Sequence, residues 1–210
     1  MEASAKPRAQ DRRRTQSERR AETRRRLLDA TIESLIEAGY AGTTIRAVTE
    51  RAGVSQGAQS HHFPHRVDLV ASAFEHLAEQ RIARYGERAR ELSGDRAARL
   101  RVLLDLLWED FSSRLFTVAA KLWVAADDDP DLRERLIPVE RRIYAASARV
   151  AREVAGELGE EPGFDRRLAV AMNTVAGLAM VREFDPSGRA RRGNPWAYHR
   201  DALERMLAAP

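Results

Sequence analysis

The fold is decided by the segment TTIRAVTERAGVSQGAQSHHFPHRVDLV, which runs from Thr43 to Val70. Within this segment, Thr43 can cap a short helix that Gly53 terminates. Ser55 can cap another short helix, which covers about Gln56 to His62. Two short helices around a tight glycine turn are the pattern of a helix-turn-helix.

Apolar residues recur at helical spacing on both sides of this segment. A stripe from about Glu18 to Ala38 predicts one helix before it, ending at Gly39, and a broad apolar face predicts a long helix from His65 to about Leu92. The sequence therefore predicts an all-α fold of about nine helices, with an N-terminal helix-turn-helix module and a larger C-terminal helical domain. The five remaining helices are expected at about Arg96 to Ser112, Leu115 to Ala126, Asp131 to Leu158, Phe164 to Phe184 and Pro195 to Leu207.

The composition excludes several classes of protein. Of the 210 residues, 43% are hydrophobic and 32% are charged, which is typical of a foldable globular chain. The absence of cysteine rules out disulfides, thiolate metal sites and a cysteine nucleophile. No apolar stretch resembles a secretory signal or is long enough to cross a membrane, so we expect a cytoplasmic protein without a membrane partner.

Positive charge is concentrated at the N-terminus. Residues 1–26 hold ten lysines or arginines against four acidic residues, whereas the whole chain carries a net charge of only +4. We expect residues 1–17 to form a disordered basic arm that a polyanion would attract. The arm is either a solvated tail or an extension that reaches into a DNA minor groove.

Residues Thr43 to Val70 closely resemble the DNA-binding signature of the TetR repressor family. The residues in family register are the helix start at Thr44, the turn Ala52 to Ser55, Gly57 and the pair His62 and Phe63, followed by the basic Arg66. The resemblance implies that the third helix enters the major groove and that the C-terminal helices bind an inducer and dimerise. It further implies a DNA-binding domain over residues 18–82 and a ligand-binding and dimerisation domain over residues 83–210.

The resemblance also implies individual contacts. Bases would be faced by Gln56, Ala58 and His61, and phosphates by Thr44, Arg46, His62 and Arg66. Two positions depart from the family pattern, because Gln59 and Ser60 stand where Leu and Tyr are usual. Either these two residues join the reading surface, or the helix packs differently in this chain.

Aromatic residues cluster on the predicted helices in the middle of the larger domain. They either fill the core or line an apolar ligand cavity between helices. The candidate cavity residues are Trp108, Phe111, Phe116 and Trp123, with Tyr144, Arg149 or Asn173 offering polar groups.

The last two predicted helices carry apolar and small residues that would let another helix approach closely. Two helices from each subunit could form a four-helix dimer interface, the alternative being packing within one chain. The candidate interface residues are Leu168, Met172, Val175, Leu178, Trp196 and Leu203.

A metal or catalytic site has little support in the sequence. His61 and His65 have the spacing of metal ligands on a helix, but Pro64 lies between them and no glutamate accompanies them. We expect no metal, no cofactor and no enzymatic activity.

The leading hypothesis is a homodimeric repressor that an unknown small molecule releases from a palindromic DNA operator. The alternatives are a constitutive DNA-binding dimer and, more remotely, a histidine-based metalloenzyme.

Overall fold

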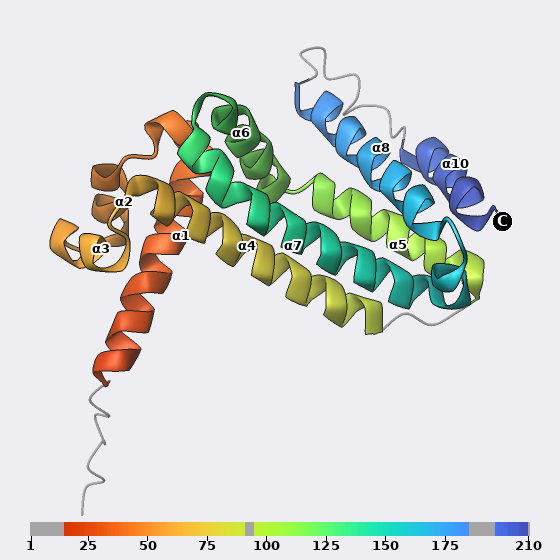
Figure 1. Ribbon diagram of the computed structural model, residues 1–210, viewed down its shortest axis with the longest axis horizontal. Coiled ribbons are helices and arrows are strands. Elements are labelled where there is room, and N and C mark those ends of the chain that lie inside the picture. The colour runs from red at the N-terminus through yellow and green to blue at the C-terminus, as the bar shows by residue number, and fades with distance from the viewer. Residues whose placement is uncertain (1–14, 91–94, 185–195, 210) are drawn as a thin grey trace, which may run out of the picture.

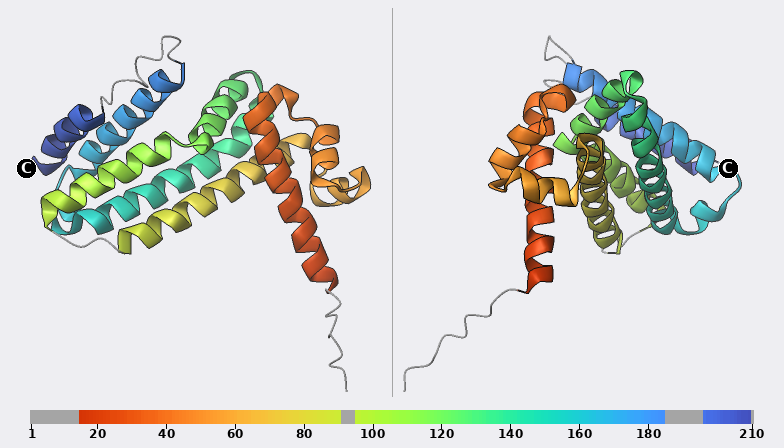
Figure 2. Two further views of the ribbon diagram at one scale, coloured as in Figure 1. Left: turned by 180° about the vertical axis from the view of Figure 1, so that it is seen from behind. Right: turned by 60° about the vertical axis from the view of Figure 1, so that its left-hand side comes forward.

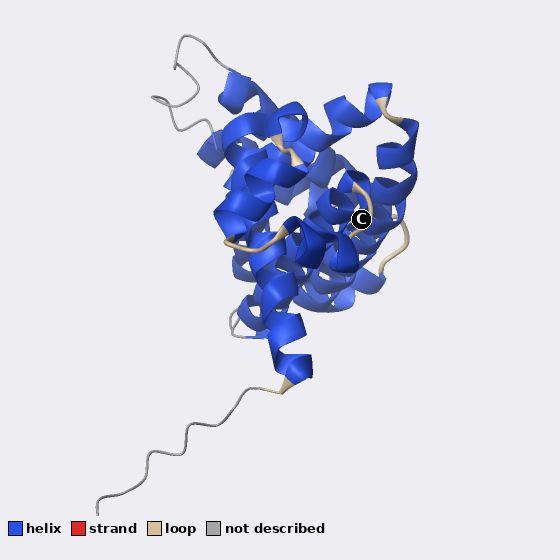
Figure 3. Ribbon diagram, turned by 90° about the vertical axis from the view of Figure 1, so that its left-hand side faces the viewer, coloured by secondary structure: helices blue, strands red, loops and turns tan. Residues whose placement is uncertain are grey.

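A computed structural model describes residues 15–90, 95–184 and 196–209. Within these ranges the chain is helical and contains no strand, which confirms the all-α prediction (Figures 1 and 3). The described elements are α1 Gln16–Gly42, α2 Ile45–Ala52, α3 Gln56–His62, α4 Arg66–Arg90, α5 Arg96–Phe111, α6 Arg114–Asp128, α7 Pro130–Ala155, the 3-10 helix η1 Gly156–Glu160, α8 Phe164–Phe184 and α10 Trp196–Ala208.

Helices α2 and α3 lie with α1 at one end of the molecule, and α5, α7, α8 and α10 form a bundle that extends to the other end (Figures 1 and 2). Helix α4 connects the two parts, because it begins beside α3 and then runs along α7. A displacement of α4 would therefore move the N-terminal helices relative to the bundle.

The first helix begins earlier than the sequence indicated. Thr15 and Glu18 form a reciprocal capping box, in which the Thr15 hydroxyl accepts from the Glu18 amide at 3.2 Å and the Glu18 carboxylate accepts from the Thr15 amide at 2.7 Å. Residues 16 and 17 are therefore helical, and the prediction of a disordered arm through residue 17 is wrong there. The rest of that predicted arm, residues 1–14, lies outside the described residues.

The start of α2 also differs from the prediction by one residue. The N-cap is Thr44, whose hydroxyl accepts a hydrogen bond from the Ala47 amide at 3.1 Å. Thr43 is buried instead, and its hydroxyl donates to the Gly39 carbonyl at 2.7 Å. Gly39 has a φ of 68° and a ψ of −174°, which are not helical, so the regular helix stops there as predicted and α1 continues beyond this kink to Gly42.

The later helices that the structure describes begin and end close to their predicted bounds, with one exception. Asp129 caps α7 by accepting from the Leu132 amide at 2.9 Å, and Pro130 occupies the first turn. The exception is the end of α7, where Gly156 has a φ of 60° and converts the expected continuation to Leu158 into a 3-10 turn. The predicted end of the long helix at about Leu92 and the predicted start of the last helix at Pro195 lie outside the described residues.

The buried residues form three clusters, and α1 contributes to two of them. Leu27 and Leu28 pack with Val48 and Phe63 in the N-terminal helices, whereas Leu35 packs in a middle cluster formed with α4, α6 and α7. The third cluster joins α5, α7, α8 and α10. The N-terminal module is therefore continuous with the rest of the core through α1 and α4.

The predicted dimer interface is wrong in its choice of residues. Five of its six members have side chains that are at most 6% exposed, because α8 and α10 pack on α5 within the same chain. Leu178 is half-buried. The buried members are Leu168, Met172, Val175, Trp196 and Leu203.

Candidate DNA-binding surface and ligand cavities

Helix α3 presents one row of exposed side chains. Gln56, Gly57, Ser60 and His61 are exposed and lie about one turn apart, so they share a face of the helix. Ser55 caps this helix by accepting from the Ala58 amide at 3.2 Å. We call these four exposed residues the reading face. Ala58 and His62 flank it and are partly buried, while Thr44 and Arg46 are exposed at the start of α2.

Gln59 does not belong to the reading face. Its side chain is buried, and Nε2 donates to the Phe63 carbonyl at 2.6 Å. Gln59 thus supplies a donor to a backbone carbonyl at the C-terminal end of α3. It does so at the position where the family usually has a buried leucine. The placement of Gln59 on the reading surface is wrong, whereas Ser60 is exposed.

Arg66 makes internal contacts through its Nη1 and by stacking on the Tyr40 ring, and its expected contact with phosphate stays a prediction. Its Nη1 donates to the carbonyls of Tyr40 at 2.9 Å and Thr43 at 3.3 Å, and its guanidinium lies 4.0 Å from the Tyr40 ring centroid. The Tyr40 hydroxyl in turn donates to the Asp129 carboxylate at 2.6 Å. Arg66 therefore joins the start of α4 to the end of α1 and, through Tyr40, to the α6–α7 turn.

Replacing Arg66 by Ala is expected to lower the free energy of unfolding by about 1–3 kcal/mol, because two partly buried carbonyls lose their donor. Urea denaturation followed by circular dichroism measures this change. Arg46→Ala is the matched control, since the Arg46 side chain is 80% exposed and its ion pair with Glu50 is solvated. Equal stability of the two variants would show that the Arg66 contacts contribute nothing.

Arginines of α1 gather beside α3, next to the reading face, a position that was not predicted from the sequence. Arg20 Nη2 donates to His61 Nε2 at 2.7 Å, and the Arg24 guanidinium lies 5.4 Å from the Phe63 ring centroid. The i, i+4 spacing of Arg20 and Arg24 on a predicted helix was the available signal. These contacts place positive charge at the C-terminal end of the reading face.

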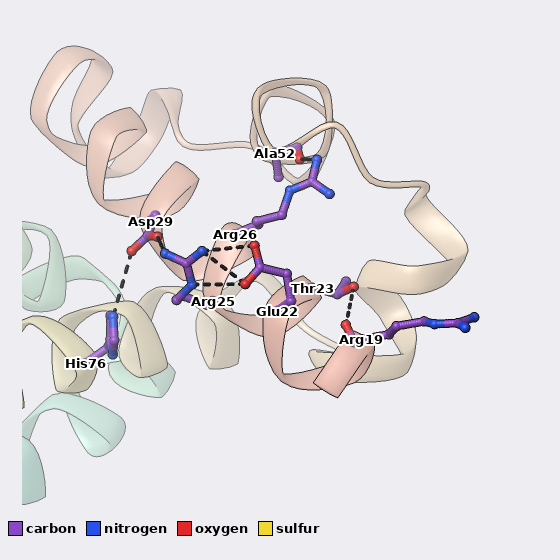
Figure 4. A network of polar contacts seen from close by, with 8 residues as sticks. All are labelled: Arg19, Glu22, Thr23, Arg25, Arg26, Asp29, Ala52 and His76. Atoms are coloured by element: carbon purple, nitrogen blue, oxygen red, sulfur yellow. Dashed lines mark hydrogen bonds and ion pairs between the residues drawn. The ribbon is translucent and has the colours of Figure 1, made fainter. Parts of the chain in front are cut away.

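The next arginines of α1 have structural roles (Figure 4). Arg25 points toward Glu22 and Asp29, with its Nη2 2.9 Å from a Glu22 carboxylate oxygen. Arg26 reaches the α2–α3 turn, where its Nη2 donates to the carbonyls of Ala52 and Gly53. Arg26 thus satisfies carbonyls that the end of α2 leaves without helical partners.

Partial burial lowers the pKa of His62, and electrostatic interactions with His61, Arg20 and Arg24 lower it further. Because the folded pKa lies below the unfolded one, the unfolded state binds more protons in the window below about 6.5. The folded state is therefore expected to lose stability as the pH falls through that window. Urea unfolding at pH 7.5 and 5.5 should show a smaller difference for His62→Gln than for the unaltered protein, and equal differences would exclude His62 as the cause.

A cavity of about 290 Å³ lies between α4, α6, α7 and α8. Five of the predicted cavity residues line it: Phe111, Phe116, Trp123, Tyr144 and Asn173. We call it the core cavity. Trp108 was wrongly included, because its ring is stacked on Trp196 with centroids 4.9 Å apart. Arg149 is exposed and does not line the cavity.

Two charged residues of the core cavity were not predicted. Glu140 accepts a hydrogen bond from Trp123 Nε1 at 2.5 Å, and desolvation raises the pKa of its carboxyl group despite that bond. Arg81 is buried and forms an ion pair with Asp110. Polar groups therefore interrupt an otherwise apolar wall, which is the usual composition of a small-molecule site.

Comparison with known proteins agrees with this arrangement. Residues 27–73 match the family model described as bacterial regulatory proteins, tetR family. Over 170 residues the chain is 35% identical to the uncharacterized HTH-type transcriptional regulator Rv2912c of Mycobacterium tuberculosis, a match that covers 80% of this chain and 87% of the relative. The chain belongs to the TetR family. It is therefore a DNA-binding transcriptional regulator.

Two further comparisons extend the likeness. The HTH-type transcriptional regulator CymR of Pseudomonas putida is 44% identical over 122 residues, which cover 58% of this chain and 60% of CymR, less than two thirds of its length. A transcriptional regulator from Rhodococcus sp. Rha1 has a solved structure that is 29% identical, with a TM-score of 0.60 over 88% of this chain and 93% of that one.

These relatives are regulators rather than enzymes. In the part of the chain that the structure describes, no three histidine, cysteine or acidic side chains are grouped as metal ligands. None of the described helices is both long enough and apolar enough to span a membrane.

Proposed function

We propose that this protein is a cytoplasmic homodimeric repressor that binds a palindromic operator through α3 and is released when a small molecule enters the core cavity. The observation that carries the proposal is the reading face of α3, which is solvent-exposed and has Arg20 of α1 beside its C-terminal end. The major groove admits one α-helix, and phosphates on its rims attract arginine.

The reading face offers specific chemistry to base edges. The Gln56 amide can pair with the N6 and N7 groups of adenine, and Gly57 beside it lets the helix backbone approach closely. Ser60 and His61 add groups that can donate and accept. Thr44 and Arg46 lie at the exposed start of α2, where they can contact phosphate.

The second copy is expected to pack on the face of α8 that the chain leaves exposed. Apolar residues lie on both sides of this helix, and a helix that is apolar all round is normally buried all round. One side packs on α5, and the other carries Val170, Asn173, Gly177 and Val181 at spacings of three or four residues. Exposed Val170, Val181 and, on α10, Tyr198 support a two-fold contact between copies.

Helix α4 offers a route from ligand to DNA. Phe74 and Arg81 of α4 line the core cavity, and Arg66 at the start of the same helix is bonded to the end of α1. A ligand that fits one position of α4 better than another would change the separation of the two α3 helices in the dimer. Structures of this fold have been solved with choline, for a regulator from Saccharomonospora viridis, and with stearoyl-CoA, for FadR of Bacillus subtilis. At 19% and 18% identity these likenesses show the fold alone.

The proposal is tested by selecting fragments from random duplex DNA with the purified protein and then screening metabolites for release of the selected DNA. We expect inverted repeats about one helical turn apart, bound with an affinity that falls steeply as salt rises. Recovery of no preferred sequence would overturn the operator. Preferred sequences that no compound releases would instead favour the constitutive DNA-binding dimer.

A further inference from the structure

We infer that the protein has a second small-molecule site, outside the core cavity, that binds an amphipathic carboxylate. This site is a cavity of about 640 Å³ between the end of α1, α6 and the end of α8. We call it the junction cavity. It adjoins the Gly39 kink and Tyr40, so an occupant would touch the segment that connects the DNA-binding helices to the bundle.

The junction cavity is separate from the core cavity. Phe111 and Phe116 line both, and their rings are packed edge to face with centroids 5.0 Å apart, so this pair forms the partition. The remaining lining residues of the two cavities differ. An occupant of one cavity can therefore be distinguished from an occupant of the other by substitution.

One end of the junction cavity holds two groups suited to a carboxylate. Arg182 Nη2 donates to the Ser112 backbone carbonyl at 3.1 Å, and both residues line the cavity. The Ser112 hydroxyl oxygen is buried and makes no hydrogen bond with any residue that the structure describes. A buried hydroxyl without a partner is costly, and a ligand carboxylate would accept from it and from the remaining N–H groups of Arg182.

The charge balance of the junction cavity favours an anion. Arg182 and Lys121 both line it, and neither forms an ion pair with a carboxylate among the described residues. Lys121 Nζ donates instead to the Ile36 carbonyl at 2.9 Å. The acidic lining residue, Glu37, is engaged by Arg51. An incoming carboxylate thus meets two cations and no unopposed negative charge.

The rest of the wall suits an apolar body attached to that carboxylate. Along α6 the lining runs through Phe116, Ala120 and Val124, and α8 adds Ala179 and Met180. Burying such a body supplies the affinity, while Arg182 and Ser112 fix its orientation. A medium-chain or aromatic carboxylate has both parts.

Calorimetric titration of the full-length protein with decanoate, decan-1-ol and decyltrimethylammonium tests the inference. We expect decanoate to bind, and to bind at least tenfold more tightly than either analogue. Arg182→Gln should weaken decanoate binding at least tenfold, and Arg182→Lys should recover part of that loss because it retains the charge. Circular dichroism confirms that each variant is folded.

Ser147→Phe is the matched control, because Ser147 lines the core cavity and not the junction cavity. It should leave decanoate affinity unchanged. The inference is overturned if decanoate does not bind, if decan-1-ol binds as tightly, or if Ser147→Phe abolishes binding while Arg182→Gln does not. Because no step of this test involves DNA, its failure is distinguishable from failure of the proposed repressor function.

Discussion

Replacing Gln56 by Glu is expected to abolish specific DNA binding while the protein stays folded. The change retains the size of the side chain but places a negative charge on the reading face, next to base acceptors and phosphates. Loss of a bidentate adenine contact alone costs about 1–3 kcal/mol, and repulsion adds to it, so we expect the Kd to rise at least thirtyfold. Fluorescence anisotropy with the selected operator measures the change.

The control for this substitution is Gln80→Glu, which makes the same chemical change at an exposed position of α4. Gln80 lies on α4, outside the reading face, and salt screens the effect of an exposed charge over about 8–10 Å, so Gln80→Glu should raise the Kd much less than Gln56→Glu does. If both variants bind equally well, α3 does not read the DNA. If both lose binding equally, the effect is one of overall charge.

Replacing Val181 by Glu is expected to convert the dimer into a monomer and to weaken operator binding by about a hundredfold or more. At a two-fold interface each substitution is introduced twice, so two carboxylates are buried against an apolar surface. A monomer engages one half-site and loses the gain from simultaneous binding of two. Sedimentation equilibrium gives the oligomeric state, and anisotropy gives the Kd.

Val124→Glu provides the comparison for Val181→Glu. Val124 is 71% exposed on α6 and Val181 is 63% exposed on α8, so both substitutions add one charge to an exposed valine. Only the α8 variant should dissociate. A dimer that persists with Val181→Glu would place the interface elsewhere on the surface, and a monomer with intact operator affinity would remove the need for dimerisation.

In α3, the sequence predicted the features that depend on neighbouring residues, but not those that depend on packing against other helices. Gly53 and Ser55 were sufficient to predict the end of α2 and the start of α3, because left-handed backbone and capping depend on residues within a few positions. Gln59 could not be placed correctly in the same way. Its burial depends on which side of a seven-residue helix meets α1 and α2, and its polar side chain gave no apolar signal for that side.

The same division applies to the larger domain. The sequence predicted α8 with its observed ends, and it predicted five of the residues that line the core cavity. It did not predict which side of α8 faces α5, because both sides are apolar and periodicity then marks no single face. Trp108 was misplaced for a related reason, since an aromatic residue on an amphipathic helix is equally suited to a cavity wall and to stacking on Trp196.

By itself the sequence determined the helices and the helix-turn-helix, because these depend on hydrogen bonds and apolar periodicity within a few turns of the chain. The tertiary structure alone decided that Arg66 bonds to backbone carbonyls inside the molecule while Arg46 lies on the surface. It also decided where the cavities lie. Tyr40 and Asp129 are 89 positions apart, and Arg66 contacts Tyr40 across 26. Such contacts depend on how helices pack, which side-chain type and local spacing do not specify.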